Sequence, residues 1–505
     1  MSRIRVANLT FYYEGSFDPV FEDVSFSIDT DWKLGFVGRN GKGKTTFLRL
    51  LQGGYEYRGT IDSSETFDYF PYPIAEEKLD KNAADFLDEL KPDCEFWRVV
   101  CELEKLDTDA DLLYRPFETL SHGERTKVML AVLFSGEHDF LLIDEPTNHL
   151  DFPSRESVKR YLKQKKGFIL VSHDRDLLDA CTDHILVLNR QSIEIQNGNF
   201  SCWWENKSRK DSFARAENEK HKKQIQKLKK ASERSRKWAD QNESTKIGYD
   251  PVKEPDHPFR PYIGAKTKKM QSRVKVYERR MEQEIARKEG LLIDIESPVD
   301  LKIKPMRHHK ETLLSVNGYG LRYRDAPENV FHDVSFSLQQ GERVFLNGAN
   351  GCGKSSLIKA ILAKNRNEEL SDVIEYGICS VVSDLVISYI NQDTSFLNGS
   401  IRRYCRDNHL EESLFCAILR QLDIERDQFE KNMEDFSEGQ KKKVLAAASL
   451  LTPAHLYIWD EPLNYIDLFS RMQIEKLIQT YQPTMLVVEH DIRFRETIAT
   501  NVIDL

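Results

Sequence analysis

One nucleotide-binding pattern occurs twice in this chain. The segments GRNGKGKTT (38–46) and GANGCGKSS (348–356) both match the phosphate-loop pattern G-x-x-x-x-G-K-[ST]. The two motif lysines, Lys44 and Lys354, are 310 residues apart. One match arises by chance in roughly 2% of chains of this length, so two matches are a strong signal. A repeat of this kind predicts a duplicated domain.

Three further motifs repeat in the same order. LSHGE (120–124) returns 316 residues later as FSEGQ, and LLIDEPTNHLD (141–151) returns at the same offset as YIWDEPLNYID. VSHD (171–174) returns as VEHD after 317 residues. We therefore expect an α/β protein in which two P-loop ATPase domains are joined by a helical linker. The predicted domains are residues 1–205, 206–295 (the linker) and 296–505.

Each glycine loop follows an apolar strand and precedes an apolar-periodic helix. This order lets backbone N–H groups at a helix N-terminus bind phosphate. The lysines are expected to reach the β- and γ-phosphates of ATP, and Thr45 and Ser355 to offer a hydroxyl to Mg²⁺. The predicted ATP-binding residues of the two loops are Gly38, Asn40, Gly41, Gly43, Lys44, Thr45, Thr46, Gly348, Asn350, Gly351, Gly353, Lys354, Ser355 and Ser356.

An acidic pair ends an apolar run in both copies. Asp144 and Asp460 are predicted to hold Mg²⁺ through water, next to Glu145 and Glu461. A carboxylate near the γ-phosphate can polarise the attacking water as a general base, so we assign that role to the two glutamates. The alternative, in which these acids only cap the next helix, is disfavoured because both copies repeat the D-E-P context.

Together these motifs resemble those of the ABC ATPases, over about 80% of the chain outside the linker. In that family two domains pair head to tail, so the resemblance implies that Lys44 faces Ser437 and Lys354 faces Ser121. It also implies an aromatic contact to adenine from Tyr13 and Tyr323. The remaining residues that the resemblance assigns are Gly123 and Gly439 in the signatures, Asp151 and Asp467 in the D-loops, and His173 and His490 as catalytic switch histidines.

The two copies depart from the family pattern in different places. The first has Tyr72 where the family places a Mg²⁺-contacting glutamine, whereas the second retains Gln392 as a metal-site candidate. The first signature has His122, and the second has Glu438, where glycine is usual. We therefore expect both sites to hydrolyse ATP at unequal rates, although tolerated substitutions explain the differences equally well.

Composition excludes several classes of protein. The eight cysteines are scattered without a C-x-x-C pair, which argues against a zinc site and a disulfide framework. No run approaches 18 apolar residues, and the N-terminus lacks the apolar core of a secretory signal. We therefore expect a cytoplasmic protein with no membrane partner.

The linker concentrates positive charge. Residues 206–290 carry 25 Lys and Arg against 13 Asp and Glu, while the rest of the chain carries 48 against 69. Apolar periodicity predicts helices near 206–237 and 266–287, separated by a proline-containing tip, so we expect an antiparallel helical hairpin. The charge is either a polyanion-binding surface or a solvated helical face. At the tip, aromatic and basic residues typical of RNA contacts are Phe259, Arg260, Tyr262 and Lys266.

A tandem ABC pair with the sequence EPTNHLD and a charged two-helix linker resembles the ABC-F family. The spacings from Lys44 to Ser121, 77 residues, and from Lys354 to Ser437, 83 residues, leave no room for an inserted arm. With the long tip, the chain most resembles the Lsa-type antibiotic-resistance branch. That resemblance implies a monomer that binds the E site of the 70S ribosome with ATP and contacts 23S rRNA and P-site tRNA. It further implies that the linker dislodges lincosamides, pleuromutilins and streptogramin A from the peptidyl-transferase centre.

Two other functions stay open. An ABC-F translation factor would relieve stalled or vacant ribosomes without any effect on drugs. The ATPase subunit of a membrane transporter would use the same nucleotide sites, but it has no need of a long basic linker. Ribosome co-sedimentation, membrane fractionation and a drug-susceptibility panel discriminate the three.

Overall fold

The computed structural model divides into two compact units, Met1–Trp203 with Pro298–Leu505, and Trp204–Ser297. The residues that it describes are 2–13, 19–39, 41–92, 94–136, 139–148, 150–188, 193–244, 268, 272, 276–277, 279–280, 303–324, 326–349, 351–422, 424, 426–464 and 466–505.

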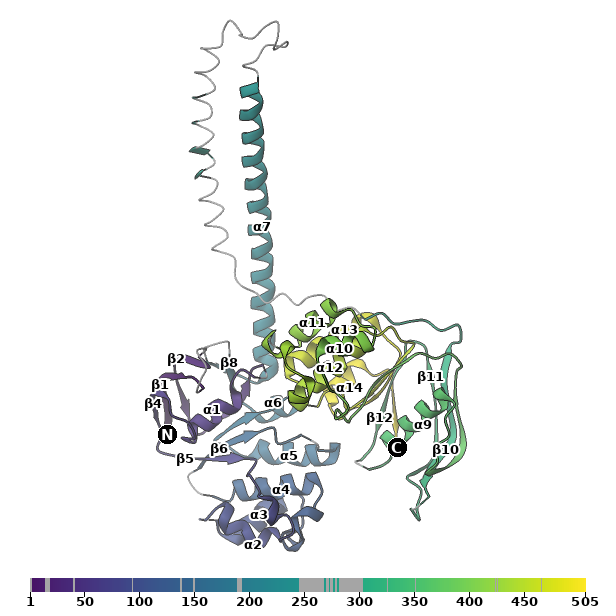
Figure 1. Cartoon of the computed structure of the whole chain (residues 1–505). Coiled ribbons are helices and arrows are strands. Elements are labelled where there is room, and N and C mark those ends of the chain that lie inside the picture. Colours follow the sequence, from purple (N-terminus) through teal and green to yellow (C-terminus); the bar gives the residue numbers. More distant parts are fainter. Residues whose placement is uncertain are drawn as a thin grey trace, which may run out of the picture. The chain divides into compact units, whose positions relative to one another are not determined.

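The first copy contains two sheets (Figure 1). The larger has the order β5-β6-β7-β3-β8-β9 and is parallel except at the antiparallel β8–β9 edge. The smaller is antiparallel, with the order β2-β1-β4. The strands are β1 (Arg3–Phe11), β2 (Phe21–Asp29), β3 (Lys33–Val37), β4 (Arg58–Asp62), β5 (Thr66–Phe70), β6 (Asp139–Asp144), β7 (Phe168–Val171), β8 (His184–Leu188) and β9 (Ile193–Asn197).

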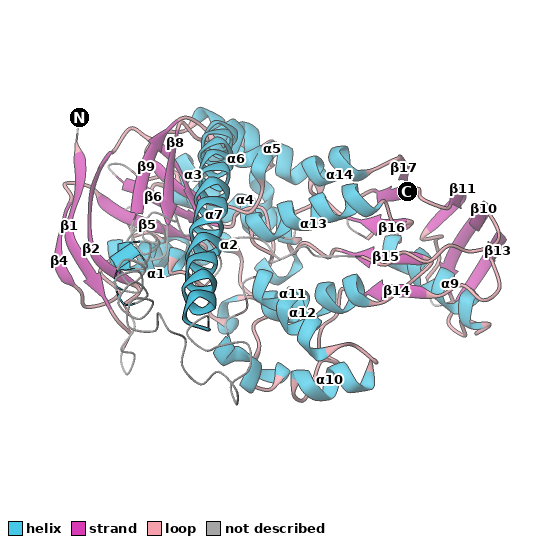
Figure 2. Cartoon of the chain, turned by 90° about the horizontal axis from the view of Figure 1, so that it is seen from above, coloured by secondary structure: helices cyan, strands magenta, loops and turns pink. Residues whose placement is uncertain are grey.

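The second copy repeats this plan. Its parallel sheet has the order β14-β15-β16-β12-β17, and its antiparallel sheet has the order β11-β10-β13. Figure 2 shows the strands of the two copies as separate groups, with α5, α6, α13 and α14 between them. The strands are β10 (Thr312–Tyr323), β11 (Phe331–Gln339), β12 (Arg343–Asn347), β13 (Val373–Val381), β14 (Ile387–Ile390), β15 (Leu456–Asp460), β16 (Met485–Val488) and β17 (Asn501–Asp504).

Helices cover the parallel sheets. The strands read as continuous apolar runs, as in FILV of β7, because both faces are buried. The helices of the first copy are α1 (Lys44–Leu51), α2 (Ala83–Leu90), α3 (Phe96–Lys105), α4 (His122–Leu133), α5 (Phe152–Gln164) and α6 (Arg175–Cys181), with 3₁₀ turns η1 (Glu76–Lys78), η2 (Ala110–Tyr114) and η3 (Phe117–Thr119). Those of the second copy are α9 (Lys354–Arg366), α10 (Ile401–Asp407), α11 (Glu412–Gln421), α12 (Glu438–Leu451), α13 (Leu468–Tyr481) and α14 (Ile492–Ile498), with η4 (Arg426–Glu430) and η5 (Met433–Asp435).

The strand and helix predicted around each phosphate loop are confirmed by β3 and α1 and by β12 and α9. Both helices begin at the motif lysine, directly after a glycine in the left-handed conformation. Gly43 has φ +101° and Gly353 has φ +97°, and a Cβ atom there would approach Val20 Cγ1 to 2.6 Å and Val330 Cγ1 to 2.5 Å. Only glycine fits these two positions without strain.

The linker begins with helix α7 (Phe200–Ser244), which is 45 residues long. It starts six residues before the predicted first arm, because the Asn199 side chain accepts a hydrogen bond from Cys202 N at 3.1 Å and caps the helix. Most of the predicted second arm and the whole tip lie outside the described residues, so the hairpin stays a prediction. Within the described part of the chain, no helix has the length and apolarity needed to span a bilayer.

Candidate nucleotide-binding sites

Each phosphate-loop lysine is folded back over its own loop. Lys44 Nζ donates to Gly38 O at 2.7 Å and to Arg39 O at 3.1 Å. Lys354 Nζ makes the equivalent bonds to Gly348 O at 2.9 Å and Ala349 O at 2.8 Å. Each lysine is therefore held at the loop whose backbone N–H groups would receive phosphate.

An oxygen-only donor set lies beside each loop. Thr45 Oγ1 donates to Asp144 Oδ2 at 2.8 Å, and burial raises the pKa of Asp144. In the second copy Ser355 bonds to Asp460, whose pKa burial also raises. The buried Asp460 Oδ1 accepts no hydrogen bond from the described residues. Hard oxygen donors, among them a buried carboxylate oxygen that accepts no hydrogen bond from the described residues, fit Mg²⁺.

The glutamate after each aspartate points at a histidine. Glu145 Oε1 is 3.3 Å from His173 Nε2, and Glu461 Oε1 is 3.9 Å from His490 Nε2. Burial, followed by the charge of Asp144, raises the pKa of Glu145 to about 8. Burial lowers the pKa of His490 to about 4, so this imidazole is neutral at physiological pH. Nearby positive charge would lower the pKa of the buried carboxyl group again and so oppose the effect of burial. As a carboxylate beside a neutral imidazole, the group could then accept a proton from water.

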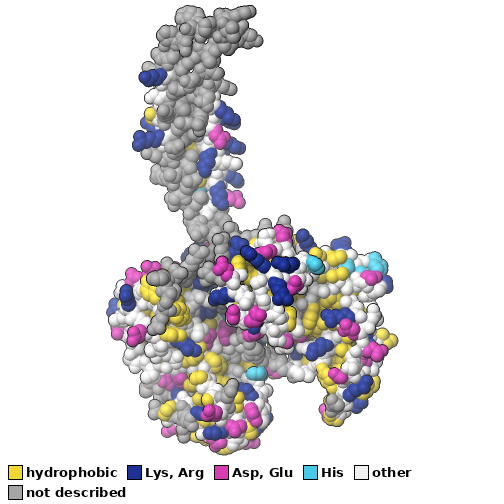
Figure 3. Space-filling model, in the orientation of Figure 1, with side chains coloured by type: hydrophobic (Ala, Val, Ile, Leu, Met, Phe, Trp, Pro, Cys, Tyr) yellow, Lys and Arg dark blue, Asp and Glu magenta, His cyan; other side chains and the backbone are white. Residues whose placement is uncertain are grey.

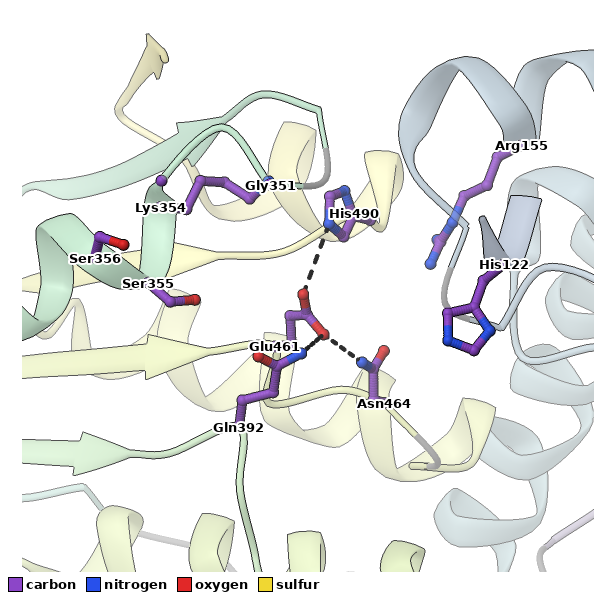
Figure 4. Close-up of a pocket in the computed structure, with 11 residues that line it drawn as sticks. His122, Arg155, Gly351, Lys354, Ser355, Ser356, Gln392, Glu461, Asn464 and His490 are labelled. Carbon is purple, nitrogen blue, oxygen red and sulfur yellow. Dashed lines mark hydrogen bonds and ion pairs between the residues drawn. The ribbon is translucent and has the colours of Figure 1, made fainter. Parts of the chain in front are cut away.

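The second site is a cavity of about 380 Å³ formed by both copies (Figure 4). The second copy contributes its phosphate loop, and Glu461, which accepts hydrogen bonds from Gln392 Nε2 at 3.0 Å and Asn464 Nδ2 at 2.8 Å. The first copy contributes His122 of its signature, and Arg155. The cavity therefore brings Lys354 together with His122 of the first signature, whereas Ser121, which the resemblance sets opposite Lys354, is not among the lining residues.

The first site also receives groups from the second copy. Although burial lowers the pKa of Lys44, the charge of Asp467 opposes this shift and that of Lys443 adds to it. Both residues belong to the second copy, at the D-loop and on α12. Arg471 Nη1 also donates to His173 O at 3.1 Å, which ties α13 to the switch histidine of the other copy.

The signature serines cap their helices. Ser121 Oγ accepts from Glu124 N, and Ser437 Oγ accepts from Gln440 N, each bond being 3.3 Å long. Both form complete capping boxes. Such caps fix the helix N-termini, where the backbone carries partial positive charge. The signature glycines, Gly123 and Gly439, lie in the first turns of α4 and α12.

The candidate adenine tyrosines are exposed and lie next to their loops. Tyr13 is 44% exposed and Tyr323 is 39% exposed. The Tyr13 hydroxyl is 2.5 Å from Thr46 Oγ1, and that of Tyr323 is 2.9 Å from Ser356 Oγ. Each ring therefore lies where a base attached to loop-bound phosphates could reach it.

Tyr72 and Gln392 occupy matching positions but make different contacts. Phe70 pairs with Ile143 in the first parallel sheet, and Ile390 pairs with Trp459 at the matching place in the second. Tyr72 lies two residues after Phe70, and Gln392 lies two residues after Ile390. The Tyr72 hydroxyl donates to Asp68 Oδ2 at 2.5 Å. It is Tyr69 that reaches the metal-site candidate, because its hydroxyl donates to Asp144 Oδ2 at 3.0 Å.

Sequence reasoning missed four residues at these sites, namely Tyr69, Asn464, Arg155 and Arg471. The two arginines had a detectable signal, because each follows its D-loop aspartate by four residues in both copies. Tyr69 had none, because its matching residue Tyr389 bonds to Asn391 Oδ1 at 3.3 Å instead. The predicted Asn40 and Asn350 of the loops, and the tip residues Phe259, Arg260, Tyr262 and Lys266, lie outside the described residues.

Comparison with known proteins places these sites in context. A family model described as "ABC transporter" matches residues 21–148 and 331–464. The chain is 28% identical over 492 residues to the ribosome protection protein VmlR of Bacillus subtilis (strain 168), covering 96% of this chain and 83% of that protein. It is 24% identical over 563 residues to ABC transporter F family member 5 of Arabidopsis thaliana, covering 100% of this chain and 75% of that protein.

A solved structure shares the fold. It is the complex of the archaeal ribosomal stalk protein aP1 with the archaeal ribosome recycling factor aABCE1. The TM-score is 0.61 at 17% identity, and the alignment covers 98% of this chain and 87% of the matched chain.

Proposed function

This chain belongs to the ABC family and is an ABC-F ATPase with two ABC domains, and from that premise we propose that it binds the ribosome with ATP and protects it against antibiotics. The proposed targets are lincosamides, pleuromutilins and streptogramin A at the peptidyl-transferase centre, as in the Lsa-type branch. The proposed domains are the ATPases at 1–205 and 296–505, with the linker at 206–295.

Similarity to a protein named for ribosome protection supports this proposal. The alignment with VmlR covers 96% of the chain, so it is not confined to the ATPase motifs that transporters share.

The observation that carries the proposal is helix α7. The predicted ATP-site residues all lie outside it, and its 45 residues follow the first ATPase copy in the sequence. Its sequence holds 13 Lys and Arg against 7 Asp and Glu, and most of its described side chains are exposed. A long basic helix favours a polyanionic partner such as ribosomal RNA.

The composite sites supply the energy for a cycle. Because residues of both copies line the same cavity, ATP held there would join the copies, and hydrolysis would release them. The predicted metal residues are Thr45 and Asp144 in the first site, with Ser355, Asp460 and Gln392 in the second. A Mg²⁺ ion bound to these oxygens would offset the charge of the β- and γ-phosphates.

The linker would act on the ribosome. We propose that it forms an antiparallel hairpin and that the tip residues Phe259, Arg260, Tyr262 and Lys266 reach the drug site or the end of the P-site tRNA. Proteins recognise folded RNA by stacking aromatic rings on exposed bases and by pairing cationic side chains with phosphates.

The variant Glu145→Gln/Glu461→Gln tests the ATP-dependent step. It should bind ATP without activating water, remain on ribosomes and inhibit translation. Pelleting through a sucrose cushion with ATP measures retention. The control is Lys44→Ala/Lys354→Ala, which should lose ATP binding and fail to pellet. Release of the double glutamine variant as readily as the wild type would show that hydrolysis is not the exit step.

Shortening the tip tests the antibiotic role. Removing about Glu243 to Ile263 should abolish resistance to lincomycin and tiamulin while ribosome pelleting continues, because the basic arms remain. The measurement is the minimum inhibitory concentration in a sensitive host expressing each variant. Retained resistance would show that the segment responsible for resistance lies outside the removed residues. A wild-type chain that pellets with ribosomes but confers no resistance would favour a translation factor, and one that fractionates with membranes would favour a transporter subunit.

A further inference from the structure

The first copy exposes three aromatic side chains in one place. Phe96 and Trp97 begin α3, and Tyr114 ends η2, with exposed fractions of 40%, 60% and 60%. The rings of Phe96 and Tyr114 are 6.1 Å apart between centroids. We call Phe96, Trp97 and Tyr114 the aromatic patch. Clustered exposed aromatic residues typically mark an interaction site.

The duplicated domain shows that folding does not require the patch. Helix α11 has the same length as α3, and η4 the same length as η2, at an offset of 316 residues. Both helices bury matching positions, Val99 and Leu103 in α3 and Phe415 and Leu419 in α11. At the exposed positions that match Phe96, Trp97 and Tyr114, the second copy has Glu412, Ser413 and Glu430. One scaffold therefore forms with or without the aromatic residues.

The segment that carries the patch is acidic. Residues 80–118 carry 12 Asp and Glu against 5 Lys and Arg, whereas the matching residues 396–434 carry 8 against 6. Glu95 accepts hydrogen bonds from Trp97 Nε1 at 2.9 Å and Arg98 Nε at 3.0 Å, which fixes the orientation of the indole. Figure 3 shows hydrophobic, acidic and basic side chains interspersed on the lobe that contains α2, α3 and α4.

From these observations we propose that the aromatic patch docks a protein surface rich in Lys and Arg. The Arg98 guanidinium already lies 5.4 Å from the centroid of the Trp97 ring. Cationic head groups of the partner would lie over the remaining aromatic faces and be attracted by the net negative charge of residues 80–118, while their aliphatic stems pack on the rings. The net negative charge of residues 80–118 repels phosphate, which disfavours RNA as the partner of this surface. The identity of the partner rests on the proposed function: it is a protein component of the ribosome, because proteins that bind ribosomal RNA carry compensating basic charge.

Site-specific crosslinking tests the partner directly. A photo-reactive phenylalanine analogue replaces Trp97 in the full-length Glu145→Gln/Glu461→Gln chain, which is then illuminated on purified 70S ribosomes. The matched control carries the analogue at Ser413. We expect the probe at 97 to give a nuclease-resistant adduct with a basic ribosomal protein, and at least about tenfold more of it than the probe at 413.

A graft of second-copy residues tests the contribution to affinity. The variant Phe96→Glu/Trp97→Ser/Tyr114→Glu should weaken ribosome binding about tenfold or more, because buried aromatic anchors dominate interface energies. The control Leu414→Ser, which removes a second-copy side chain that is 44% exposed, should leave the affinity unchanged. The thermal unfolding midpoint of both variants should stay within about 2 °C of the parent, since exposed positions are being changed.

The outcomes separate this surface from the proposed function. An adduct with rRNA at position 97, an adduct with a second copy of this chain, or unchanged affinity of the folded graft would overturn the proposal while ribosome binding stands. Failure of the parent chain to pellet with ribosomes would overturn both the proposed function and this partner.

Discussion

Two glutamates adopt a backbone conformation that non-glycine residues rarely use. Glu145 has φ +53° and Glu461 has φ +48°. Each is held by its N–H group, which donates to Val171 O at 2.9 Å or Val488 O at 3.0 Å on the neighbouring strand. Strained residues of this kind persist where the surroundings fix them, typically at functional sites. Because both glutamates share this conformation, the expected difference in hydrolysis rate between the two sites must come from the residues around them.

The hydroxyl of Tyr69 is one such difference. We expect Tyr69→Phe to raise the Mg²⁺ concentration needed for half-maximal ATP binding at the first site about tenfold, because a hydrogen bond to a carboxylate contributes about 1.5 kcal/mol. Fluorescent-nucleotide titrations in a Lys354→Ala background measure this shift. Tyr389→Phe, measured in a Lys44→Ala background, is the matched control. Equal shifts in the two variants would contradict a special role for Tyr69.

Gln392 is the other difference, because it contacts Glu461 whereas Tyr72 bonds to Asp68. We therefore expect Glu461→Gln to slow steady-state ATP turnover more than Glu145→Gln. Phosphate release with ribosomes present gives both rates. An equal loss in the two single variants would show that the sites work at the same rate.

At the scale of elements, the helices of the two copies meet through buried polar groups. Arg175 of α6 forms an ion pair with Glu475 of α13, and both side chains are less than 10% exposed. Arg493 of α14 pairs with Asp179 Oδ2 at 2.5 Å and donates to Ser201 Oγ at 3.2 Å. Ser201 lies in the first turn of α7, so both copies hold the start of this helix.

The contribution of the Arg175–Glu475 pair to stability can be tested by substitution. Glu475→Ala should lower stability by about 3 kcal/mol, because it leaves a buried guanidinium without its partner. Arg175→Ile together with Glu475→Leu should recover most of that loss. Thermal unfolding of the nucleotide-free protein gives the midpoints of the parent and the two variants. If the double variant were as unstable as Glu475→Ala, the loss of stability would come from altered packing at this contact and not from an unpaired buried charge.

Local patterns were enough to predict the elements that carry the ATP motifs. Strands β3 and β12 and the helices after them follow from apolar runs and glycine loops, which act within a few residues. The contacts between Arg175 and Glu475, or between Arg471 and His173, were not predictable, because they depend on how two distant copies pack. The start of α7 was missed because one cap, Asn199, decides it rather than the helical periodicity.

At the scale of the whole molecule, charge is divided between segments. The residues outside 206–290 carry a net charge of −21, whereas residues 206–290 carry +12. The acidic part discourages non-specific attraction to nucleic acid, so binding to RNA depends on the linker.

This division predicts a steep dependence of ribosome binding on salt. If the linker neutralises several phosphates, the logarithm of the affinity should fall linearly with the logarithm of salt concentration, with a slope near −0.7 to −0.9 per phosphate. Pelleting of the Glu145→Gln/Glu461→Gln variant from 50 to 300 mM KCl measures the slope. Replacing four lysines of α7, Lys222, Lys223, Lys229 and Lys230, by glutamine should reduce its magnitude by up to about three. A flat profile would exclude phosphate contacts as the main source of affinity.

The ion pair between α6 and α13 also makes the two copies non-interchangeable. The position that matches Glu475 in the first copy is Lys159, and the position that matches Arg175 in the second copy is Ile492. Two first copies brought together in the same way would set Arg175 against Lys159, so two cations would be buried face to face. Two second copies would set Ile492 against Glu475 and leave a carboxylate without a counterion. Each half therefore favours the other half as its partner, which disfavours the association of two first halves or of two second halves from neighbouring chains.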